Sequence, residues 1–184
     1  MNKLQSLIEK CVAGDTRSQE LLYRTFSTSM MGICIRYSSD LSEAEDILQT
    51  GFIKIFAKIS TFKNEGSFEG WMKRIMINTG IEYYRKKQRS QAVENLDDCS
   101  LILPDQRPGS SLDVKDLLNI VQQLPSHYRT VFTLHAIEGY SHKEIAGLLN
   151  ITELASRANL CRAREILKKH ILKINLNEPE YLAC

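Results

Sequence analysis

Arginine side chains in a short two-helix pattern near the carboxyl end of the chain are its clearest candidates for chemistry. From Ser141 to Lys169 two helical patterns are joined at residues 150–152, and the second is rich in arginine. A guanidinium group presents a planar fork of donors that matches a guanine edge or phosphate oxygens. The pattern is typical of a helix-turn-helix motif and indicates DNA binding, although a solvated helix face would carry the same charges.

Local signals place both helices of this motif. Ser141 and Glu144 stand at the spacing of a capping box, which begins a helix. Asn150 tolerates the left-handed conformation that ends a helix, and Thr152 can cap the next one. The residues of the second helix that are expected to face the core are Leu160, Ala163, Leu167 and Ile171. The outward face is expected to carry Ala158, Arg162, Glu165 and Lys169, with Arg157 and Cys161 on one flank.

Length and composition predict a soluble protein of one or two small domains. The chain has 184 residues, of which 43% are hydrophobic, and its mean hydropathy is −0.25. Its longest apolar stretch, Met30 to Ile35, is far shorter than the ~20 residues that span a bilayer. The amino terminus carries Glu9 where a signal peptide would be apolar. We therefore expect no membrane insertion and a cytoplasmic location.

The distribution of charge is more informative than the net charge of +2. Basic residues dominate residues 70–89 and residues 153–184, whereas acidic residues dominate the segment between them, residues 90–128. The five cysteines form no C-x-x-C pair and no cluster with histidine at zinc-ligand spacing, so we expect no metal and no cofactor. No glycine-rich phosphate loop or nucleophile elbow occurs, so the sequence does not predict an enzyme.

The fold class expected from these patterns is all-α, with two small helical domains joined by a flexible linker. Asp15 is expected to cap one helix, and Ser42 with Glu45 to form a capping box for a helix that ends near Ser60. Ser67 is expected to cap a long helix that ends in the basic residues 85–87, and a further helix should span 126–138. The predicted divisions are a helical domain at 1–90, an acidic, proline-containing linker at 91–111, and a helix-turn-helix domain at 112–184.

Four motifs in order resemble the extracytoplasmic-function (ECF) sigma factors, the small promoter-recognition subunits of bacterial RNA polymerase. Two lie in the first domain, Ala44–Phe52 (AEDILQTGF) and Phe68–Asn78 (FEGWMKRIMIN). Two lie in the second, Leu124–Phe132 (LPSHYRTVF) and Ser141–Ala146 followed by Arg162-Ala163-Arg164. The resemblance covers nearly the whole chain, and the combination of motifs is more specific than any one of them.

The resemblance implies core RNA polymerase and promoter DNA as partners, with an anti-sigma factor as a further candidate. It implies that Glu45, Asp46 and Gln49 bind the polymerase clamp, although they could merely solubilise a helix. The residues that it assigns to the downstream (minus-10) element are Asn64, Ser67, Phe68, Trp71, Lys73, Arg74, Asn78, Arg85 and Lys86. For Phe68 and Trp71, aromatic residues at helical spacing, packing in the core is the stronger expectation. The residues that it assigns to the upstream (minus-35) element are His142, Lys143, Ser156, Arg157, Ala158, Cys161 and Arg162.

Three questions stay open at this stage. Leu154-Ala155 stands where members of the family commonly carry Gly-Thr, so the affinity for the upstream element is in question. The acidic segment from Glu94 to Asp105 could thread through a basic polymerase channel or could be a plain disordered tether. The alternative function is a stand-alone dimeric helix-turn-helix regulator that binds a palindrome without polymerase, which leaves the first domain unexplained.

Overall fold

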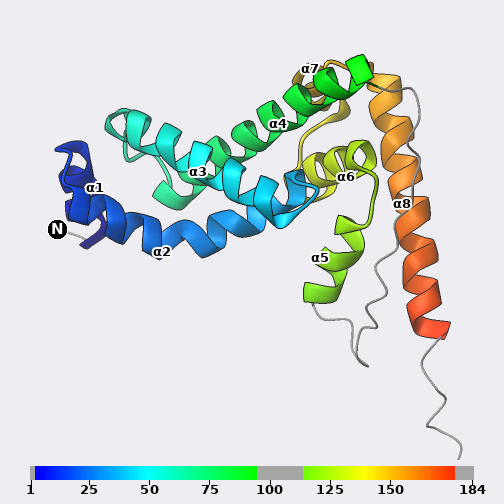
Figure 1. The fold of residues 1–184 in the computed structure, drawn as a ribbon, viewed down its shortest axis with the longest axis horizontal. Coiled ribbons are helices and arrows are strands. Elements are labelled where there is room, and N and C mark those ends of the chain that lie inside the picture. The colour runs from blue at the N-terminus through cyan, green and yellow to red at the C-terminus, as the bar shows by residue number, and fades with distance from the viewer. Residues whose placement is uncertain (1–2, 95–113, 177–184) are drawn as a thin grey trace, which may run out of the picture. The chain divides into compact units, whose positions relative to one another are not determined.

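The computed structural model describes residues 3–94 and 114–176, and these residues confirm the all-α fold class (Figure 1). The chain divides into two compact units, Met1–Val93 and Glu94–Cys184. The described residues contain no β-strand. None of their helices combines the length and the apolar character that crossing a bilayer requires. The predicted linker beyond residue 94 and the tail beyond residue 176 lie outside the described residues, as does most of the segment of the threading hypothesis.

The first unit consists of four helices linked by short turns. They are α1 (Lys3–Val12), α2 (Thr16–Cys34), α3 (Leu41–Lys58) and α4 (Phe68–Glu94), with single 3₁₀ turns at Ile35–Tyr37 and Ile59–Thr61. The helix α2 packs against both α1 and α3. The largest fully buried side chains of this unit are Leu22, Met30, Ile47, Ile55, Met72 and Met76. They come from α2, α3 and α4, so these three helices share one hydrophobic core.

Two glycines lie where α4 closely approaches its neighbours. A Cβ atom at Gly51 of α3 would meet the sulfur of Met76, the end of a flexible side chain that can move aside. A Cβ atom at Gly80 of α4 would lie 2.7 Å from the Cγ atom of Tyr37, close to the Tyr37 backbone, so a larger residue there would force that ring and α4 apart. The close approach of α4 to Tyr37 therefore depends on Gly80.

The predicted helix starts of this unit are confirmed with one exception. Asp15 accepts a hydrogen bond from the backbone N–H of Ser18 at 2.9 Å, and Ser67 accepts one from that of Gly70 at 3.0 Å. The capping box predicted at Ser42 and Glu45 is wrong, because the cap of α3 lies two residues earlier, at Asp40, which accepts a hydrogen bond from Glu43 N–H at 2.8 Å. The helix α4 continues to Glu94, past the predicted helix end at residues 85–87 and the predicted domain end at residue 90.

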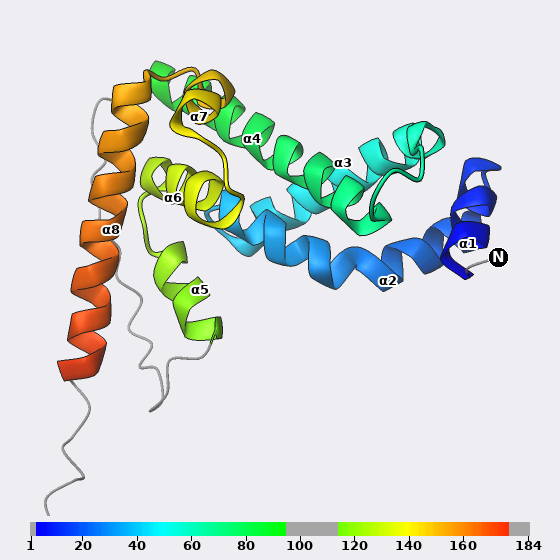
Figure 2. The same ribbon diagram turned by 180° about the vertical axis from the view of Figure 1, so that it is seen from behind.

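The second unit contains the helix-turn-helix (Figure 2). Its helices are α5 (Val114–Gln122), α6 (Ser126–Phe132), α7 (His142–Leu149) and α8 (Glu153–Leu176), with a π-helical turn at Thr133–Ile137 after α6. The single helix predicted for 126–138 therefore changes its hydrogen-bonding pattern at Thr133. In the core of this unit, Ile120 of α5 and Leu124, which follows that helix by two residues, pack against Ala163 and Leu167 of α8.

The turn of the helix-turn-helix has the predicted local structure. Ser141 and Glu144 form the capping box, in which the Ser141 N–H donates to Glu144 Oε2 at 2.8 Å and the Glu144 N–H donates to Ser141 Oγ at 3.3 Å. Asn150 has the left-handed conformation with φ of 56°. Thr152 Oγ1 accepts a hydrogen bond from Ala155 N–H at 3.1 Å and begins α8. These contacts fix the angle at which α8 leaves α7.

Candidate polymerase-binding and DNA-binding surfaces

The outward face of α3 carries the residues expected to bind polymerase. Glu45, Asp46 and Gln49 are exposed, whereas Ile47 and Leu48 between them are buried. The structure adds Ile53 to this face, because it follows Asp46 and Gln49 at helical spacing and is 69% exposed. The sequence motif did not single out Ile53, since an isoleucine in an apolar helix is ordinarily assigned to the core. The face therefore combines acidic and amide groups with one large apolar side chain.

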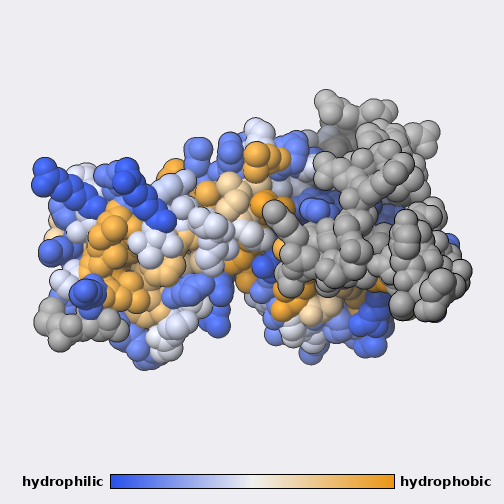
Figure 3. Space-filling model, turned by 90° about the horizontal axis from the view of Figure 1, so that it is seen from below, coloured by the Kyte–Doolittle hydropathy of each residue, from blue (hydrophilic) through white to orange (hydrophobic). Residues whose placement is uncertain are grey.

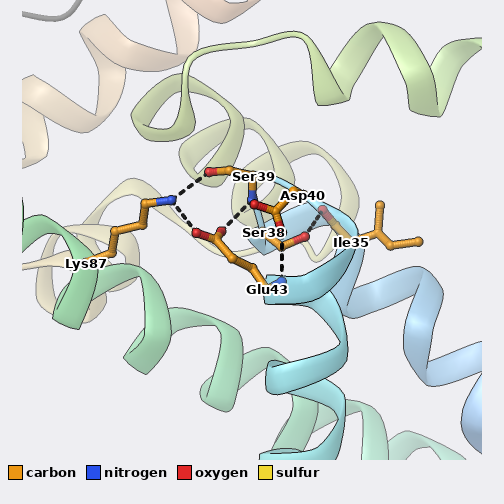
Figure 4. A network of polar contacts seen from close by, with 6 residues as sticks. All are labelled: Ile35, Ser38, Ser39, Asp40, Glu43 and Lys87. Atoms are coloured by element: carbon orange, nitrogen blue, oxygen red, sulfur yellow. Dashed lines mark hydrogen bonds and ion pairs between the residues drawn. The ribbon is translucent and has the colours of Figure 1, made fainter.

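A partly buried polar network holds the start of α3 against α4 (Figure 4). Lys87 Nζ of α4 lies 2.5 Å from Glu43 Oε1 and 2.9 Å from Ser39 Oγ. Glu43 Oε2 accepts a further hydrogen bond from the backbone N–H of Ser39 at 2.7 Å. The side chains of Glu43 and Lys87 are only 18% and 30% exposed. Lys87 is thus partly buried and engaged within this unit, although its sequence neighbours form a basic run.

The electrostatics of Glu43 reflect this network. Burial acts to raise its pKa, but the hydrogen bonds from Lys87 and from the Ser39 backbone, together with the charge of Lys87, outweigh that effect. The pKa of Glu43 is consequently held below its ordinary value. Tyr83 of α4 also donates to this carboxylate, and burial followed by the Glu43 charge raises the pKa of the Tyr83 hydroxyl. The carboxylate therefore stays ionised at neutral pH.

An aromatic cluster supports the loop before α4. Phe68 is only 3% exposed, and its ring stacks on Trp71 at a centroid distance of 5.6 Å and meets Phe62 edge to face at 5.1 Å. The ring of Phe68 thus packs in the core of this unit, which is the stronger expectation for it, and this burial does not favour its contact with DNA. Trp71 is half-buried, and the exposed Asn64 lies in the loop with φ of 59°. The exposed hydroxyl of Ser67 is engaged as the helix cap.

One face of α4 presents the basic residues. Arg74, Asn78, Arg85 and Arg89 are spaced by four, seven and four residues, which places them on one side of the helix, and Lys86 is exposed beside them. The four cations among these form no ion pair within the part of the chain that the structure describes. Lys73 differs, because its Nζ lies 3.1 Å from Glu69 Oε1. Hydrogen bonds from Lys73 and Ser29 hold the pKa of Glu69 below its ordinary value.

Exposed apolar side chains also occur on the first unit, and Figure 3 shows part of this apolar surface in orange near the end that holds α1. The large exposed hydrophobic residues of this unit are Val12, Leu21, Tyr23, Leu41 and Ile53.

Cys11 and Cys34 are buried, and burial raises the pKa of both thiols, that of Cys34 to about 12. These two cysteines are therefore protonated packing residues. No group of metal-ligating side chains occurs among the described residues.

A pair of histidines joins the π-helical turn at Thr133–Ile137 to α7, and one of them also bonds to α8. The rings of His135 and His142 stack with centroids 4.4 Å apart and planes 14° from parallel. His142 Nδ1 lies 2.9 Å from Ser156 Oγ, and His135 Nδ1 lies 2.8 Å from the Tyr140 carbonyl oxygen. Ser156 is fully buried and its hydroxyl bonds α8 to α7, so this burial does not favour its predicted contact with DNA. Desolvation, then the charges of His135 and Arg157, lower the pKa of His142.

The outward face of α8 carries the remaining candidates. Arg157, Ala158, Cys161 and Arg162 are exposed, as is Lys143 of α7. Both arginines bond within the helix, Arg157 to Glu153 and Arg162 to Glu165. Leu154 is 77% exposed in the first turn. The predicted core face is confirmed, because Leu160, Ala163 and Leu167 are buried.

Comparison with known proteins accounts for both units. The family model described as "Sigma-70 region 2" matches residues 22–90, and the one described as "Sigma-70, region 4" matches residues 115–167. Together they cover more than half of the chain. The RNA polymerase sigma-H factor of Pseudomonas aeruginosa is 28% identical over 177 residues, covering 90% of this chain and 92% of that protein. The ECF RNA polymerase sigma factor SigW of Bacillus subtilis is 29% identical over 180 residues, covering 91% and 96%.

The chain belongs to the ECF RNA polymerase sigma factors. The region 2 match contains α3 and nearly all of α4. The region 4 match contains α6, α7 and the first half of α8. Among solved structures, the sigma factor RpoE in complex with the anti-sigma factor NepR from Bartonella quintana shares the fold with this sigma factor. That similarity has a TM-score of 0.50 and 22% identity, and it covers 84% of this chain and 96% of that chain.

Proposed function

We propose that this sigma factor directs bacterial RNA polymerase to promoters, opens the DNA there and so starts transcription. The observation that carries the proposal is that one chain holds both a region 2 match and a region 4 match, in that order. The alternative, a stand-alone dimeric regulator, is not favoured because it leaves the first unit without a role. The residues named below are assigned by their exposure and charge on this fold. Catalysis belongs to the polymerase.

The outward face of α3 is proposed to bind core RNA polymerase. Asp46 and Gln49 supply polar groups for a basic partner surface, and Ile53 supplies an apolar anchor among them. Binding energy at protein interfaces concentrates in such anchors, which the polar rim shields from water. We expect Ile53→Glu to weaken polymerase binding at least tenfold. Leu41→Glu, at an exposed site near the start of the same helix, serves as the matched control.

The helix α4 and the loop before it are proposed to open the downstream element and to hold the separated strand. Single-stranded DNA is bound by cations that follow the phosphates and by aromatic rings on which bases stack. The free cations of α4 supply the first, and the partly exposed ring of Trp71 supplies the second, while Asn64 adds polar atoms in the loop. Phe68 supports Trp71 from the core side. The helix-turn-helix is proposed to bind the upstream element through α8, with Lys143 at the backbone.

Run-off transcription with purified core polymerase on genomic fragments tests the proposal. The sigma factor should direct initiation from specific sites, whereas a dimeric regulator alone would footprint a symmetric site without polymerase. Reversing the charge of both Arg85 and Lys86 to Glu should weaken initiation, because their phosphate contacts are lost. Initiation that is unchanged in this double variant would remove the basic end of α4 from the mechanism, and failure to initiate anywhere would refute the proposal itself.

A cytoplasmic location and an anti-sigma partner complete the proposal. The solved relative is bound to an anti-sigma factor, and this sigma factor offers an apolar groove of about 280 Å³ in its second unit. The groove is lined by Leu118, Ile120, Val121, Phe132, Ile137, Leu167 and Ile171. An anti-sigma factor should compete with core polymerase for the chain. Leu118→Glu should weaken an anti-sigma factor that uses the groove, and an unchanged affinity would place the contact elsewhere.

A further inference from the structure

The position of Leu154 on α8 is unusual for a leucine. It is 77% exposed, and it lies on the side of the helix opposite Leu160 and Ala163, which are buried. A single exposed leucine needs no explanation by itself. This one, however, stands in the first turn of the second helix of a helix-turn-helix, and the N-terminal residues of that helix contact base edges in such motifs. The residues around Leu154 on α8 indicate which group of a base pair it would contact.

The centre of the outward face of α8 is apolar, and cations lie at its sides. Ala158 follows Leu154 by one helical turn and is exposed on the same line. Neither side chain can donate or accept a hydrogen bond. Arg157 and Arg162 lie on either side of this line, and each is bonded to a carboxylate of the helix itself. The face thus offers an apolar contact in the middle and arginines paired with carboxylates at the edges.

In the major groove of DNA, the exposed apolar group of a base pair is the C5-methyl group of thymine. Resting on the function proposed above, we propose that Leu154 determines specificity by packing against a thymine methyl group in the upstream promoter element. Ala158 extends the contact along the groove, and the flanking arginines face the negative phosphates on both sides. The upstream element is therefore recognised in part by van der Waals contact, and the Leu154-Ala155 start of the helix is a specificity feature.

Deoxyuridine provides the test, because it differs from thymidine only by the missing methyl group. The probe is a duplex promoter fragment on which the reconstituted holoenzyme initiates, with thymidines of the upstream footprint replaced one at a time. Burying one methyl group contributes ~0.8 kcal/mol, so one or two replacements should weaken holoenzyme binding about fourfold. With Leu154→Ala this sensitivity should disappear at those positions, whereas Leu154→Met should keep it.

Leu172→Ala is the matched control, because Leu172 is an exposed leucine on the same helix, 49% exposed and well beyond the first turn. It should retain the full sensitivity to deoxyuridine. Equal binding of thymidine and deoxyuridine fragments at every position, or full sensitivity in Leu154→Ala, would overturn the inference while initiation shows that the chain still works as a sigma factor. A chain that initiates on no promoter would overturn both this inference and the proposed function.

Discussion

Lys87 stands in a basic run of the sequence, but in the structure it is bonded to Glu43 and Ser39, and Lys87→Met tests this structural role. Methionine keeps the length and the apolar stem of lysine, so the substitution removes the charge and the donors with little change in packing. Lys87 is partly buried and bonds to Glu43 and Ser39 within the first unit, whereas Lys86 is exposed beside the free cations of α4. We therefore expect opposite effects from Lys87→Met and its matched control, Lys86→Met.

The expected loss of stability follows from the burial of the pair. Exposed ion pairs contribute up to ~1 kcal/mol, and hydrogen bonds to charged groups contribute ~1.5–3 kcal/mol. With side chains 18% and 30% exposed, the pair lies between these cases, so Lys87→Met should lower the free energy of unfolding by about 1–2 kcal/mol. Lys86→Met should change it by less than about 0.5 kcal/mol. The chain has one tryptophan, Trp71, so urea unfolding followed by its fluorescence reports on the first unit.

The effect on DNA binding should be reversed. The slope of log K against log salt concentration is negative, and each phosphate contact that is lost makes it less steep by about 0.7–0.9. Lys86→Met should therefore make this slope less steep for holoenzyme binding to a promoter fragment, and Lys87→Met should leave it unchanged. If Lys87→Met reduced the slope and left the unfolding curve unchanged, Lys87 would be a DNA contact, and the network with Glu43 would have no structural role.

The pair should also respond to pH. The folded state holds the pKa of Glu43 below its ordinary value of 4.5, so the unfolded chain takes up the proton first as the pH falls. The stability that Glu43 contributes is thus complete above about pH 4.5 and is lost as the pH falls through the lower, folded pKa. A double-mutant cycle of Lys87→Met with Glu43→Gln should show coupling at pH 7 that diminishes in acid. The exposed pair of Lys73 and Glu69 should give at most about 0.5 kcal/mol.

Three further predictions concern other parts of the fold. Gly80→Ala should destabilise the first unit by about 1–3 kcal/mol, because its Cβ atom would enter the ring of Tyr37. Gly147→Ala, with open space around it, should stabilise the second unit by up to ~1 kcal/mol. Equal effects of the two substitutions in urea unfolding would contradict the close packing at Gly80. Restoring Gly-Thr at Leu154-Ala155 should change affinity for the upstream element in gel-shift assays and leave polymerase binding intact, and if both stayed unaltered these positions would have no role. His142 has a lowered pKa, so its neutral form is favoured by folding and the second unit should lose thermal stability as the pH falls below about 6.5, less so in His142→Gln; an equal loss in both would exclude this histidine.

The features that were predicted correctly from the sequence depend on neighbours a few residues away. The capping box of Ser141 and Glu144 and the left-handed Asn150 each involve a few adjacent residues, and the structure has both. The cap of α3 was predicted at Ser42 because that serine satisfies the same local rule as Asp40. Lys87, which is distant in sequence, bonds to Glu43 and Ser39 at the observed start of α3. No local pattern could reveal that α3 begins after Asp40 and not after Ser42.

Burial of the site residues depends on contacts across the fold in the same way. The rings around Phe68 agree with its expected place in the core, whereas the burial of Ser156, whose hydroxyl lies 2.9 Å from His142 Nδ1, has no sign in the sequence motif. In the opposite direction, Ile53 was overlooked because its type suggests the core, although it is 69% exposed. Residue type and spacing assign a face to a helix, but packing against other helices decides which side chains of that face reach solvent.

The two units differ in how their exposed cations are paired with carboxylates. On α4 Lys87 is bonded to the carboxylate of Glu43 in α3, whereas Arg74, Arg85 and Arg89 form no ion pair within the described residues of the chain. On α8 the arginines that face outward are bonded to carboxylates of their own helix, and the centre of the face is apolar. Free cations bind phosphates regardless of sequence, whereas apolar contacts distinguish one base from another. The first unit is therefore suited to hold the DNA strand, and the second is suited to choose the site.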